Sequence, residues 1–383
     1  MSELEFNPVA NIFPLMQGAE YNQLKDDITA NGLLDSIWLD TEGRILDGRN
    51  RCRVCLDVGV EPQYRTYEGS DELKFVISKN LHRRHLSESQ RAVVASRLAN
   101  MPAHRIDNKS ANLPTSISQT QAASMLNVSE RSLRTVKAIE RDAPELIERI
   151  ESGEITAHEA QKEIKLQQRT EARAEIAKVG ASVMPDNRWH IYQGDIATWQ
   201  APRKYDFIIT DPPYPKEYLP LWETLAKRAS EWLKPSGLLI AMSGQSYLDE
   251  IYQLLSKHLE YYWTACYLTP GQPTPLRQVN VNTTWKPLLV YSNSKYTGKI
   301  FGDVFKSDGN DKSYHKWGQS ESGMCDIISK ICLEGQYILD PFCGAGTTGI
   351  ASLRNKCLFD GLDIDGENVK ISQGRIANDT EAD

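Results

Sequence analysis

The stretch that decides the fold of this chain occupies residues 336–348 and reads Gln336-Tyr337-Ile338-Leu339-Asp340-Pro341-Phe342-Cys343-Gly344-Ala345-Gly346-Thr347-Thr348. Its first four residues are apolar enough for a β-strand, and residues 349–353 can begin a helix. Gly344 and Gly346 carry no Cβ, so the loop between these elements can turn tightly and approach a ligand closely. Thr347 stands where a phosphate-binding loop has lysine, so hydroxyls and backbone amides face a neutral or carboxylate-bearing ligand.

An acidic residue ends the next predicted strand. Residues 357–363 follow the short helix and finish at Asp363. A carboxylate at this place can hydrogen-bond both ribose hydroxyls of a nucleoside cofactor. The glycine loop and the acid together favour a cofactor site, and S-adenosylmethionine fits its requirements.

A second signature closes another strand-like run. Residues 207–210 are apolar and lead into Asp211-Pro212-Pro213-Tyr214. An exocyclic amine on a base is a poor nucleophile, so an enzyme must hold its N–H groups with acceptors. Asp211 can accept one N–H, and the prolines lack an N–H, which leaves backbone carbonyls as further acceptors. Tyr214 offers a ring on which an extruded base can stack. The alternative, an ordinary loop after a buried strand, is disfavoured by the glycine loop.

From about residue 189 to 376 the chain resembles the beta class of DNA amino-methyltransferases, with a tetrad of the DPPY type. In that class the catalytic tetrad precedes the target-recognition segment and the glycine loop comes last, as here. The resemblance implies S-adenosyl-L-methionine as cofactor and a catalytic tetrad of Asp211, Pro212, Pro213 and Tyr214. It further implies a cofactor site that comprises Asp195, Asp340, Pro341, Phe342, Gly344, Gly346, Thr347, Thr348, Asp363 and Gln319.

The resemblance also bears on the target base. Aspartate at the head of the tetrad is shared by adenine-N6 enzymes, whereas serine there more often accompanies cytosine-N4 transfer, so adenine in double-stranded DNA is expected. The chain departs from the family at Trp317, where proline is more frequent, and at Asp363, where glutamate is commoner. Two alternatives stay open: cytosine-N4 methylation, and a DNA-binding regulator or partition factor whose methyltransferase domain is inert.

Residues 5–165 carry a second resemblance, to the ParB-like partition proteins and their helical DNA-binding region. It rests on residues 45–53 and 80–87. In partition proteins the first motif binds a nucleotide, and an acidic residue after the glycine is associated with hydrolysis. Arg49 stands at that place here, so hydrolysis is not expected. The resemblance leaves arginines that could hold phosphates of DNA, which we favour, or of a nucleotide: Arg49, Arg51, Arg53, Arg83 and Arg84.

A basic stretch lies inside this acidic protein. The chain has a net charge of -7, yet residues 79–141 contain 11 lysines or arginines and four aspartates or glutamates, a local charge of +7. Residues 118–136 predict two short helices around a turn at Asn127, with Ser129 capping the second helix. This is helix-turn-helix spacing, and the first turn of the second helix would face DNA bases. The DNA-binding candidates are Ser129, Arg131, Ser132 and Arg134. The alternative is a solvated helical hairpin.

The length of 383 residues predicts two or three domains. We expect a small α+β ParB-like domain over residues 1–80, a helical helix-turn-helix region over 81–165 and a linker helix over 166–186. A Rossmann-like α/β methyltransferase domain follows over 187–383, with the ends of its strands at Asp211 and Asp340 adjacent. A long polar stretch, residues 245–316, is the expected target-recognition segment, with Arg277 as a base-reading candidate.

Composition bounds the cellular setting. No apolar run reaches the 18 residues of a membrane helix, no signal peptide is recognisable, and seven scattered cysteines fit a reducing compartment. We therefore expect a cytoplasmic, DNA-associated protein of a bacterium or phage, without a membrane partner. The resembled families make a homodimer a candidate assembly. A zinc site from Cys52, Cys55, His82 and His85 is not expected, because the gap between the pairs is too wide.

Overall fold

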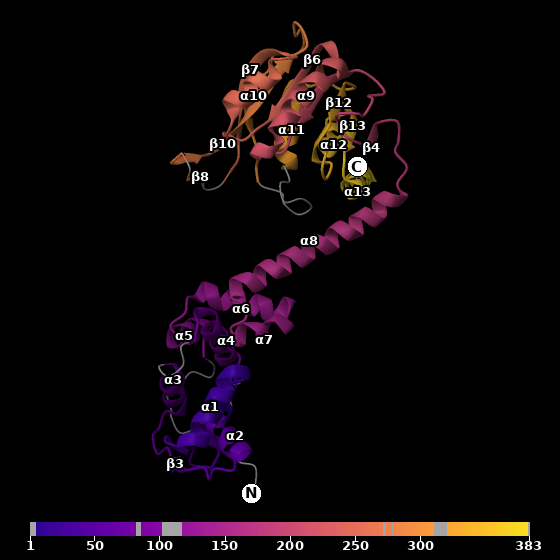
Figure 1. Ribbon diagram of the computed structural model, residues 1–383. Coiled ribbons are helices and arrows are strands. Elements are labelled where there is room, and N and C mark those ends of the chain that lie inside the picture. The colour runs from indigo at the N-terminus through magenta and orange to yellow at the C-terminus, as the bar shows by residue number, and fades with distance from the viewer. Residues whose placement is uncertain are drawn as a thin grey trace. The chain divides into compact units, whose positions relative to one another are not determined.

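The computed structural model describes residues 5–81, 86–101, 117–270, 273–277, 279–309 and 320–381. The chain forms two compact units, Met1–Gln167 and Gln168–Asp383 (Figure 1). No described helix combines the length and the apolar character that crossing a bilayer requires.

The C-terminal unit has an α/β fold, as predicted. Among its described residues, eight strands form one mixed sheet in the order β11-β7-β10-β6-β5-β12-β13-β4. β10 runs antiparallel to both neighbours, and the other pairs are parallel. The elements are β4 (Trp189–Gln193), β5 (Tyr205–Thr210), η3 (Lys216–Tyr218), α9 (Leu219–Trp232), β6 (Leu233–Met242), α10 (Leu248–Leu255), β7 (Glu260–Leu268), β8 (Thr274–Leu276), β9 (Val281–Thr283), β10 (Trp285–Ser292), β11 (Val304–Lys306), α11 (Glu321–Ile331), β12 (Tyr337–Asp340), α12 (Thr347–Arg354), β13 (Leu358–Asp363) and α13 (Gly366–Glu381).

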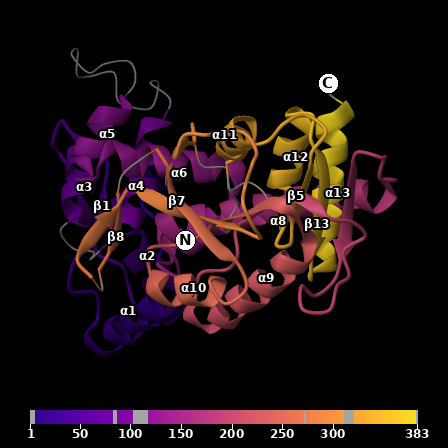
Figure 2. The same ribbon diagram turned by 90° about the horizontal axis from the view of Figure 1, so that it is seen from above.

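Helices cover both faces of this sheet. Figure 2 shows α9 and α10 on one side and α11 and α12 on the other. Phe207 and Ile209 of β5 pack into the cluster beneath α11, α12 and α13, whereas Ile208 packs against α9 and α10. A strand that is buried on both faces needs a continuous apolar sequence, which explains the run before Asp211.

The direction of the chain reverses between β5 and β12. From β5 the chain moves outward to β6, and it later returns to place β12 on the other side of β5. The two strands are parallel, with Leu339 opposite Ile208. The predicted adjacency of the strand ends at Asp211 and Asp340 is therefore confirmed, and this reversal is where such sheets form a ligand crevice.

The N-terminal unit combines a small sheet with helices. Its strands lie in the order β2-β1-β3, with β1 antiparallel to β2 and parallel to β3. A helical part follows, and α8 crosses from this unit into the next. The elements are η1 (Pro8–Ile12), α1 (Gly18–Asn31), β1 (Ile37–Leu39), β2 (Ile45–Asp47), α2 (Arg49–Val58), β3 (Tyr64–Thr66), α3 (Glu72–Leu81), α4 (Glu88–Ala99), α5 (Gln119–Met125), α6 (Glu130–Asp142), α7 (Glu145–Glu151) and α8 (Ala157–Ser182).

Helices α5 and α6 flank a tight turn. Asn127 in this turn has a φ of 50°, a left-handed conformation that asparagine tolerates better than most residues. Ser129 caps α6 by accepting a hydrogen bond from the Ser132 N–H at 3.0 Å. The two predicted helices, their turn and the cap at Ser129 are confirmed; their role in DNA binding stays a prediction.

The second half of α8 packs onto the C-terminal helix α13. A Cβ on Gly180 would lie 1.7 Å from the Lys370 carbonyl oxygen, so the two helices cross in backbone contact. Ile176 beside this crossing packs with Ile371 and with Ala345 of the glycine loop. The segment predicted as a linker, residues 166–186, thus includes helix that supports the glycine loop.

The crossing at Gly180 can be tested by substitution. We expect Gly180→Ala to lower the free energy of unfolding of the C-terminal unit by about 1–3 kcal/mol, because the added methyl meets backbone that cannot move aside. This loss outweighs the gain of about 1 kcal/mol that alanine brings to a helix interior. Tryptophan fluorescence during denaturation reports on this unit, since seven of the eight tryptophans lie in it.

Gly302→Ala is the matched control, because nothing lies within 4 Å of the added Cβ. Equal stability of the two variants would contradict a tight α8–α13 contact.

Candidate active site

Asp211 and Tyr214 face each other across the turn that follows β5. The Tyr214 hydroxyl donates a short hydrogen bond to Asp211 Oδ1. Both side chains are half-buried, and Pro212 between them is buried. Because neither Pro212 nor Pro213 has an N–H, the backbone of these two residues can offer a ligand only its carbonyl acceptors. The predicted tetrad thus forms one compact cluster at the carboxyl end of β5.

Tyr214 is held by groups from two further strands. Its ring lies against Gly244 after β6, with a ring carbon 3.5 Å from where a Cβ would stand. Lys286 Nζ in β10 lies 3.4 Å from the Tyr214 hydroxyl and 5.3 Å from the ring centroid. Burial, and to a lesser extent the Asp211 charge, raises the pKa of Tyr214 well above its usual value. The phenol therefore stays protonated at neutral pH and acts as a donor.

The two glycines of the loop after β12 have different structural roles. Gly344 and Gly346 have φ values of 53° and 79°, in the left-handed region that favours glycine. Beside Gly344 the nearest atom to an added Cβ is the Phe342 carbonyl oxygen at 4.0 Å, so the loop is open there. A Cβ on Gly346 would lie 2.7 Å from the Ser372 Cβ of α13. Gly344 thus leaves room for a ligand, whereas Gly346 permits close packing of α12 on α13.

Asp340 is a buried carboxylate that joins the tetrad to the glycine loop. Its Oδ1 accepts hydrogen bonds from the Thr210 hydroxyl at 2.6 Å and from the Phe342 N–H at 3.1 Å. Its Oδ2 accepts from the Thr348 hydroxyl at 2.6 Å. Burial raises the pKa of Asp340 to about 6, although these three bonds oppose the rise. Asp340 and Thr348, predicted to contact a cofactor, are therefore engaged with the protein itself.

Two more acidic residues lie at or just after the carboxyl ends of the neighbouring strands β13 and β4. Asp363 Oδ2 accepts from the Gly344 N–H at 2.9 Å, which fixes the glycine loop, and Oδ1 accepts from the Asp365 N–H at 2.9 Å. Asp195 is exposed, and its Oδ1 accepts from the Ala197 N–H at 2.8 Å. The Gly194 N–H donates to the Asp363 carbonyl at 3.0 Å. The structure thus brings Asp195, Asp363 and Gly344 together at the carboxyl ends of β4, β13 and β12.

The start of α12 is fixed by an arginine from α13. Arg375 is buried and donates to the Ala345 carbonyl at 2.6 Å and to the Thr347 hydroxyl at 3.3 Å, while Glu321 pairs with it at 2.6 Å. Pro341 is buried and Phe342 is half-buried in the same loop. Gln319 lies outside the described residues.

The protonation of Asp340 makes the free energy of unfolding depend on pH. Its pKa in the folded protein exceeds the ordinary value of 3.8, so its contribution is present at low pH and is lost as pH rises through about 6. Asp340→Asn removes this titration and keeps most hydrogen bonds. We therefore expect the wild type to gain roughly 1–2 kcal/mol in unfolding free energy relative to this variant between pH 8 and pH 5.

Denaturant titrations of both proteins at several pH values measure this difference. A difference that is constant from pH 8 to pH 5 would contradict the raised pKa of Asp340.

Three side chains of the site were not predicted from the sequence. Thr210 and Arg375 act through hydrogen bonds to distant segments, and Lys286 reaches the tetrad from another strand. For Lys286 a signal existed, because it is a lone cation at the start of the apolar run 287–291. Nothing in the local sequence connects it to Tyr214.

The predicted phosphate-binding arginines of the N-terminal unit make bonds within the protein. Arg49 donates to Asn11 Oδ1 at 2.8 Å and to the Phe13 carbonyl. Arg51 pairs with Asp35 and, at 2.9 Å, with Asp47. Both are buried, because α2 turns them into the core of the unit, and together with Lys79 they line a pocket of about 130 Å³. Their binding of phosphate stays a prediction. Arg53 is half-buried over the Tyr21 ring. Arg83 and Arg84 lie outside the described residues.

The first turn of α6 presents arginines and uses its serines internally. Ser129 Oγ caps the helix, and Ser132 Oγ donates to Glu88 Oε1 at 2.6 Å. Arg131 is exposed, and Arg134 is exposed while paired with Glu130 at 2.7 Å. Of the four predicted DNA contacts, the two arginines are therefore the ones placed to meet a ligand.

Arg277 stands at the turn of a separate hairpin. β8 and β9 pair antiparallel, with Leu276 opposite Val281, and Arg277 is exposed beyond the end of β8. The hairpin lies within the predicted target-recognition segment. It leads directly into β10, whose second residue is Lys286.

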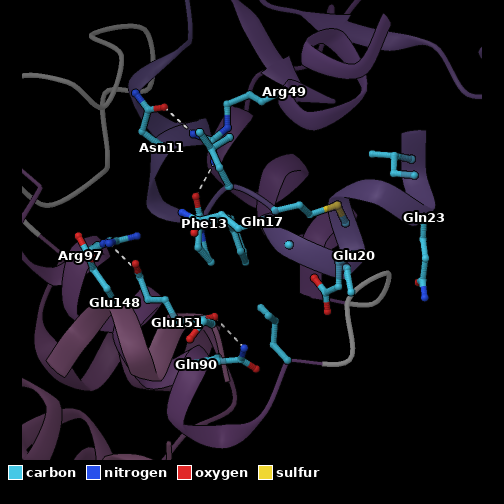
Figure 3. Close-up of a pocket in the computed structure, with 18 of the residues that line it drawn as sticks. Asn11, Phe13, Gln17, Glu20, Gln23, Arg49, Gln90, Arg97, Glu148 and Glu151 are labelled. Atoms are coloured by element: carbon cyan, nitrogen blue, oxygen red, sulfur yellow. Dashed lines mark hydrogen bonds and ion pairs between the residues drawn. The ribbon is translucent and has the colours of Figure 1, made fainter. Parts of the chain in front are cut away.

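A large cleft of about 1220 Å³ lies in the N-terminal unit (Figure 3). Four carboxylates line it against two arginines, Arg49 and Arg97, and Arg97 is paired with Glu151 at 2.5 Å. Carboxylates therefore outnumber cations in this cleft, and both guanidinium groups are bonded to other groups of the protein.

The described residues hold no cluster of three or more His, Cys, Asp or Glu side chains placed to bind a metal ion. Cys52 and Cys55 are buried in α2, where burial raises the pKa of both thiols. His82 and His85 lie outside the described residues.

The geometry of the C-terminal unit agrees with comparisons to known proteins. Residues 205–374, which span the tetrad, the crevice and the glycine loop, match the N6_N4_Mtase family of DNA methylases. The type II methyltransferase M2.DpnII of Streptococcus pneumoniae is 44% identical over 86 residues, which are 22% of this chain and 31% of that protein. M2.LlaDCHI of Lactococcus lactis subsp. cremoris is 38% identical over 85 residues, 21% of this chain and 31% of that protein. The chain thus matches about a third of the length of these relatives.

Solved structures also align with the chain. The M1.HpyAVI–SAM complex has 24% identity and a TM-score of 0.42, with 49% of this chain and 99% of that chain covered. The cytosine-N4-specific PvuII DNA methyltransferase has 14% identity and a TM-score of 0.42, with 51% and 91% covered.

Proposed function

We propose that this protein is a DNA methyltransferase that transfers a methyl group from S-adenosylmethionine to the exocyclic N6 of adenine. The observation that carries the proposal is the juxtaposition of the Asp211–Tyr214 pair and the open Gly344 loop at the carboxyl ends of adjacent strands β5 and β12. Both lie in the segment that matches the DNA methylase family.

The crevice beside the tetrad fits this cofactor. Gly344 has open space beside it, and the loop and Thr347 at the start of α12 would receive the methionine part. Asp363 would hold the ribose with the acceptor capacity left by its backbone bonds, and Asp195 lies beside it for the adenine. When bound, S-adenosylmethionine supplies a methyl group made electrophilic by its sulfonium. The described residues of the loop include no positive side chain that would repel that sulfonium. Arg375 of α13 contacts the loop, but Glu321 neutralises its charge.

The tetrad orients the nucleophile. The target base must leave the duplex, because an enzyme cannot reach its amine inside the stack. Asp211 accepts one amine N–H and the Pro212 carbonyl accepts the other, which withdraws the nitrogen lone pair from the ring. Tyr214 provides the stacking surface. In the structure the Tyr214 hydroxyl occupies Asp211 Oδ1, so an incoming amine takes over an acceptor that is already aligned.

The proposed role of Asp211 predicts a selective loss. We expect Asp211→Ala to reduce methyl transfer to DNA by at least about 100-fold, because a preorganised hydrogen-bonding partner is removed. Cofactor affinity should remain within about twofold, since Asp211 faces the base. Transfer of labelled methyl groups to unmodified DNA measures the first quantity, and calorimetry with S-adenosylmethionine measures the second. Full activity of the variant would refute the assignment.

The target base is settled by the product. Aspartate at the head of the tetrad supports adenine, and digestion of modified DNA should yield N6-methyl-2′-deoxyadenosine. Recovery of N4-methylcytosine would replace adenine by cytosine. A wild-type protein that binds DNA but transfers no methyl group would instead be a DNA-binding regulator with an inert domain.

The arginines of α6 support double-stranded DNA as the partner of the N-terminal unit. We expect Arg131→Ala to weaken duplex binding severalfold and to lower the slope of log affinity against log salt by about one, because one phosphate contact is lost. Fluorescence anisotropy with a labelled duplex at several salt concentrations measures both. Arg141→Ala, at the far end of the same helix and paired with Asp142, should bind as the wild type does. Equal loss in both variants would argue against the first turn of α6 as the part of the helix that contacts DNA.

A further inference from the structure

One lysine stands beside the tetrad without an acidic partner. Because β10 runs antiparallel to the other strands of its neighbourhood, its first residues lie at the end of the sheet where β5 and β6 finish. Lys286 lies there, opposite Tyr267 of β7. It is half-buried, and no ion pair of Lys286 occurs among the described residues.

The contacts of this amine are specific. Nζ lies 3.4 Å from the Tyr214 hydroxyl oxygen and 3.9 Å from Met242 Sδ, and it stands 5.3 Å from the Tyr214 ring centroid. A partly buried ammonium loses hydration, and weak partners such as a phenol oxygen and a thioether do not replace it fully. Such a charge is retained only where something else favours it, and the nearest anion through the phenol is the Asp211 carboxylate.

We propose that Lys286 is a positioning residue, which acts through the Tyr214 phenol to align the tetrad tyrosine and to favour an ionised acceptor at Asp211. The inference rests on the proposed methyl transfer and deepens it. Lys286 need not touch the base, the cofactor or the migrating methyl group.

The geometry gives the lysine a role in both states of the tetrad. Without a base, the phenol donates to Asp211 and accepts from Lys286. The phenol oxygen accepts from the ammonium through a lone pair, and the bond to Asp211 uses the phenol O–H instead. The lysine contact can therefore remain when an incoming amine displaces the phenol from Asp211. Tyr214 then keeps one anchor while its bond to Asp211 opens. Loss of the lysine would leave the released ring without a polar anchor.

The charge of Lys286 is the second part of the argument. The ammonium and the Asp211 carboxylate contact the same phenol oxygen, which places them within the roughly 6 Å at which an opposite charge favours the ionised carboxyl. The other titratable groups around Asp211 in the described residues are Asp340, Tyr214 and Tyr267, from β12, the tetrad turn and β7. Lys286 adds a positive charge to these groups, on the far side of the phenol from Asp211.

Steady-state methylation of DNA from a methylation-deficient bacterium tests the proposal with the full chain. We expect Lys286→Met to lower kcat/KM for DNA by about 10- to 100-fold, as a misplaced reacting group does. In a plot of kcat/KM against pH, the fall in activity on the acid side should begin about one pH unit higher in this variant, because the cation beside the Asp211 carboxyl is gone. Lys286→Arg should restore the acid side of the profile. Affinity for S-adenosylmethionine should stay unchanged.

Lys330→Met is the matched control. Lys330 also lies above an aromatic ring, that of Phe305 at 5.5 Å, but it pairs with Asp326 and makes no contact with the tetrad. It should leave the rate and the pH profile as in the wild type.

A double-mutant cycle separates action through the phenol from general effects. Tyr214→Phe keeps a ring and removes the hydroxyl that links Lys286 to Asp211. If Lys286 acts through that hydroxyl, Lys286→Met should change kcat/KM much less in the Tyr214→Phe background than in the wild type. Equal effects in both backgrounds, or a pH profile unchanged by Lys286→Met, would overturn the proposal.

Failure of the inference is distinct from failure of the proposed function. An active wild type with an unaffected Lys286→Met variant rejects only the role of Lys286. A wild type that transfers no methyl group to DNA rejects the function itself. If Lys286→Met does not fold, Lys286→Arg and Lys286→Gln carry the same comparison, with arginine expected to retain the acid side of the profile and glutamine to shift it.

Discussion

The hydrogen bonds at Asp340 are the constraint on which the rest of the C-terminal unit depends. One buried carboxylate ties the last residue of β5, the loop after β12 and the first turn of α12 together. Because a buried charge is costly unless its acceptors are satisfied, few other arrangements of these segments are tolerated. The position of Asp211 relative to Gly344 follows from this network. The same network explains why the pKa of Asp340 rises only to about 6 despite complete burial.

Much of this unit could be predicted from local sequence. Short apolar runs that end in aspartate predicted β5 and β12, and the glycines predicted the loop between β12 and α12. The antiparallel direction of β10 could not be predicted, because strand direction depends on contacts between segments far apart in the chain. For this reason the contact between Lys286 and Tyr214 could not be predicted from the sequence. Asp340 was expected to face a ligand, and its inward orientation is set by Thr210, which lies 130 residues earlier.

The N-terminal unit shows how little residue type alone says about burial. Arg49 and Arg51 were expected to hold phosphates, which stays a prediction, but their burial and their bonds within the unit could not be read from the sequence. The same residue type stabilises a core when aspartates lie opposite, and the position of Asp35 and Asp47 is a tertiary property. The cap at Ser129 was predictable, because capping is a local interaction within four residues. Its partner Glu88, in another helix, was not.

The hairpin of β8 and β9 has a consequence for the evolution of such proteins. Within the part of the chain that the structure describes, its strands pair with each other and with no strand of the main sheet. A segment whose backbone bonds are internal can be lengthened, shortened or exchanged between relatives without disturbing the pairing of its neighbours. Since it leads directly into β10, any replacement would join the sheet next to Lys286, at the start of that strand. Under the proposed function, the preference for one DNA sequence over another can therefore diverge among descendants by exchange of this hairpin alone, while the framework of β5 and β12 is inherited unchanged.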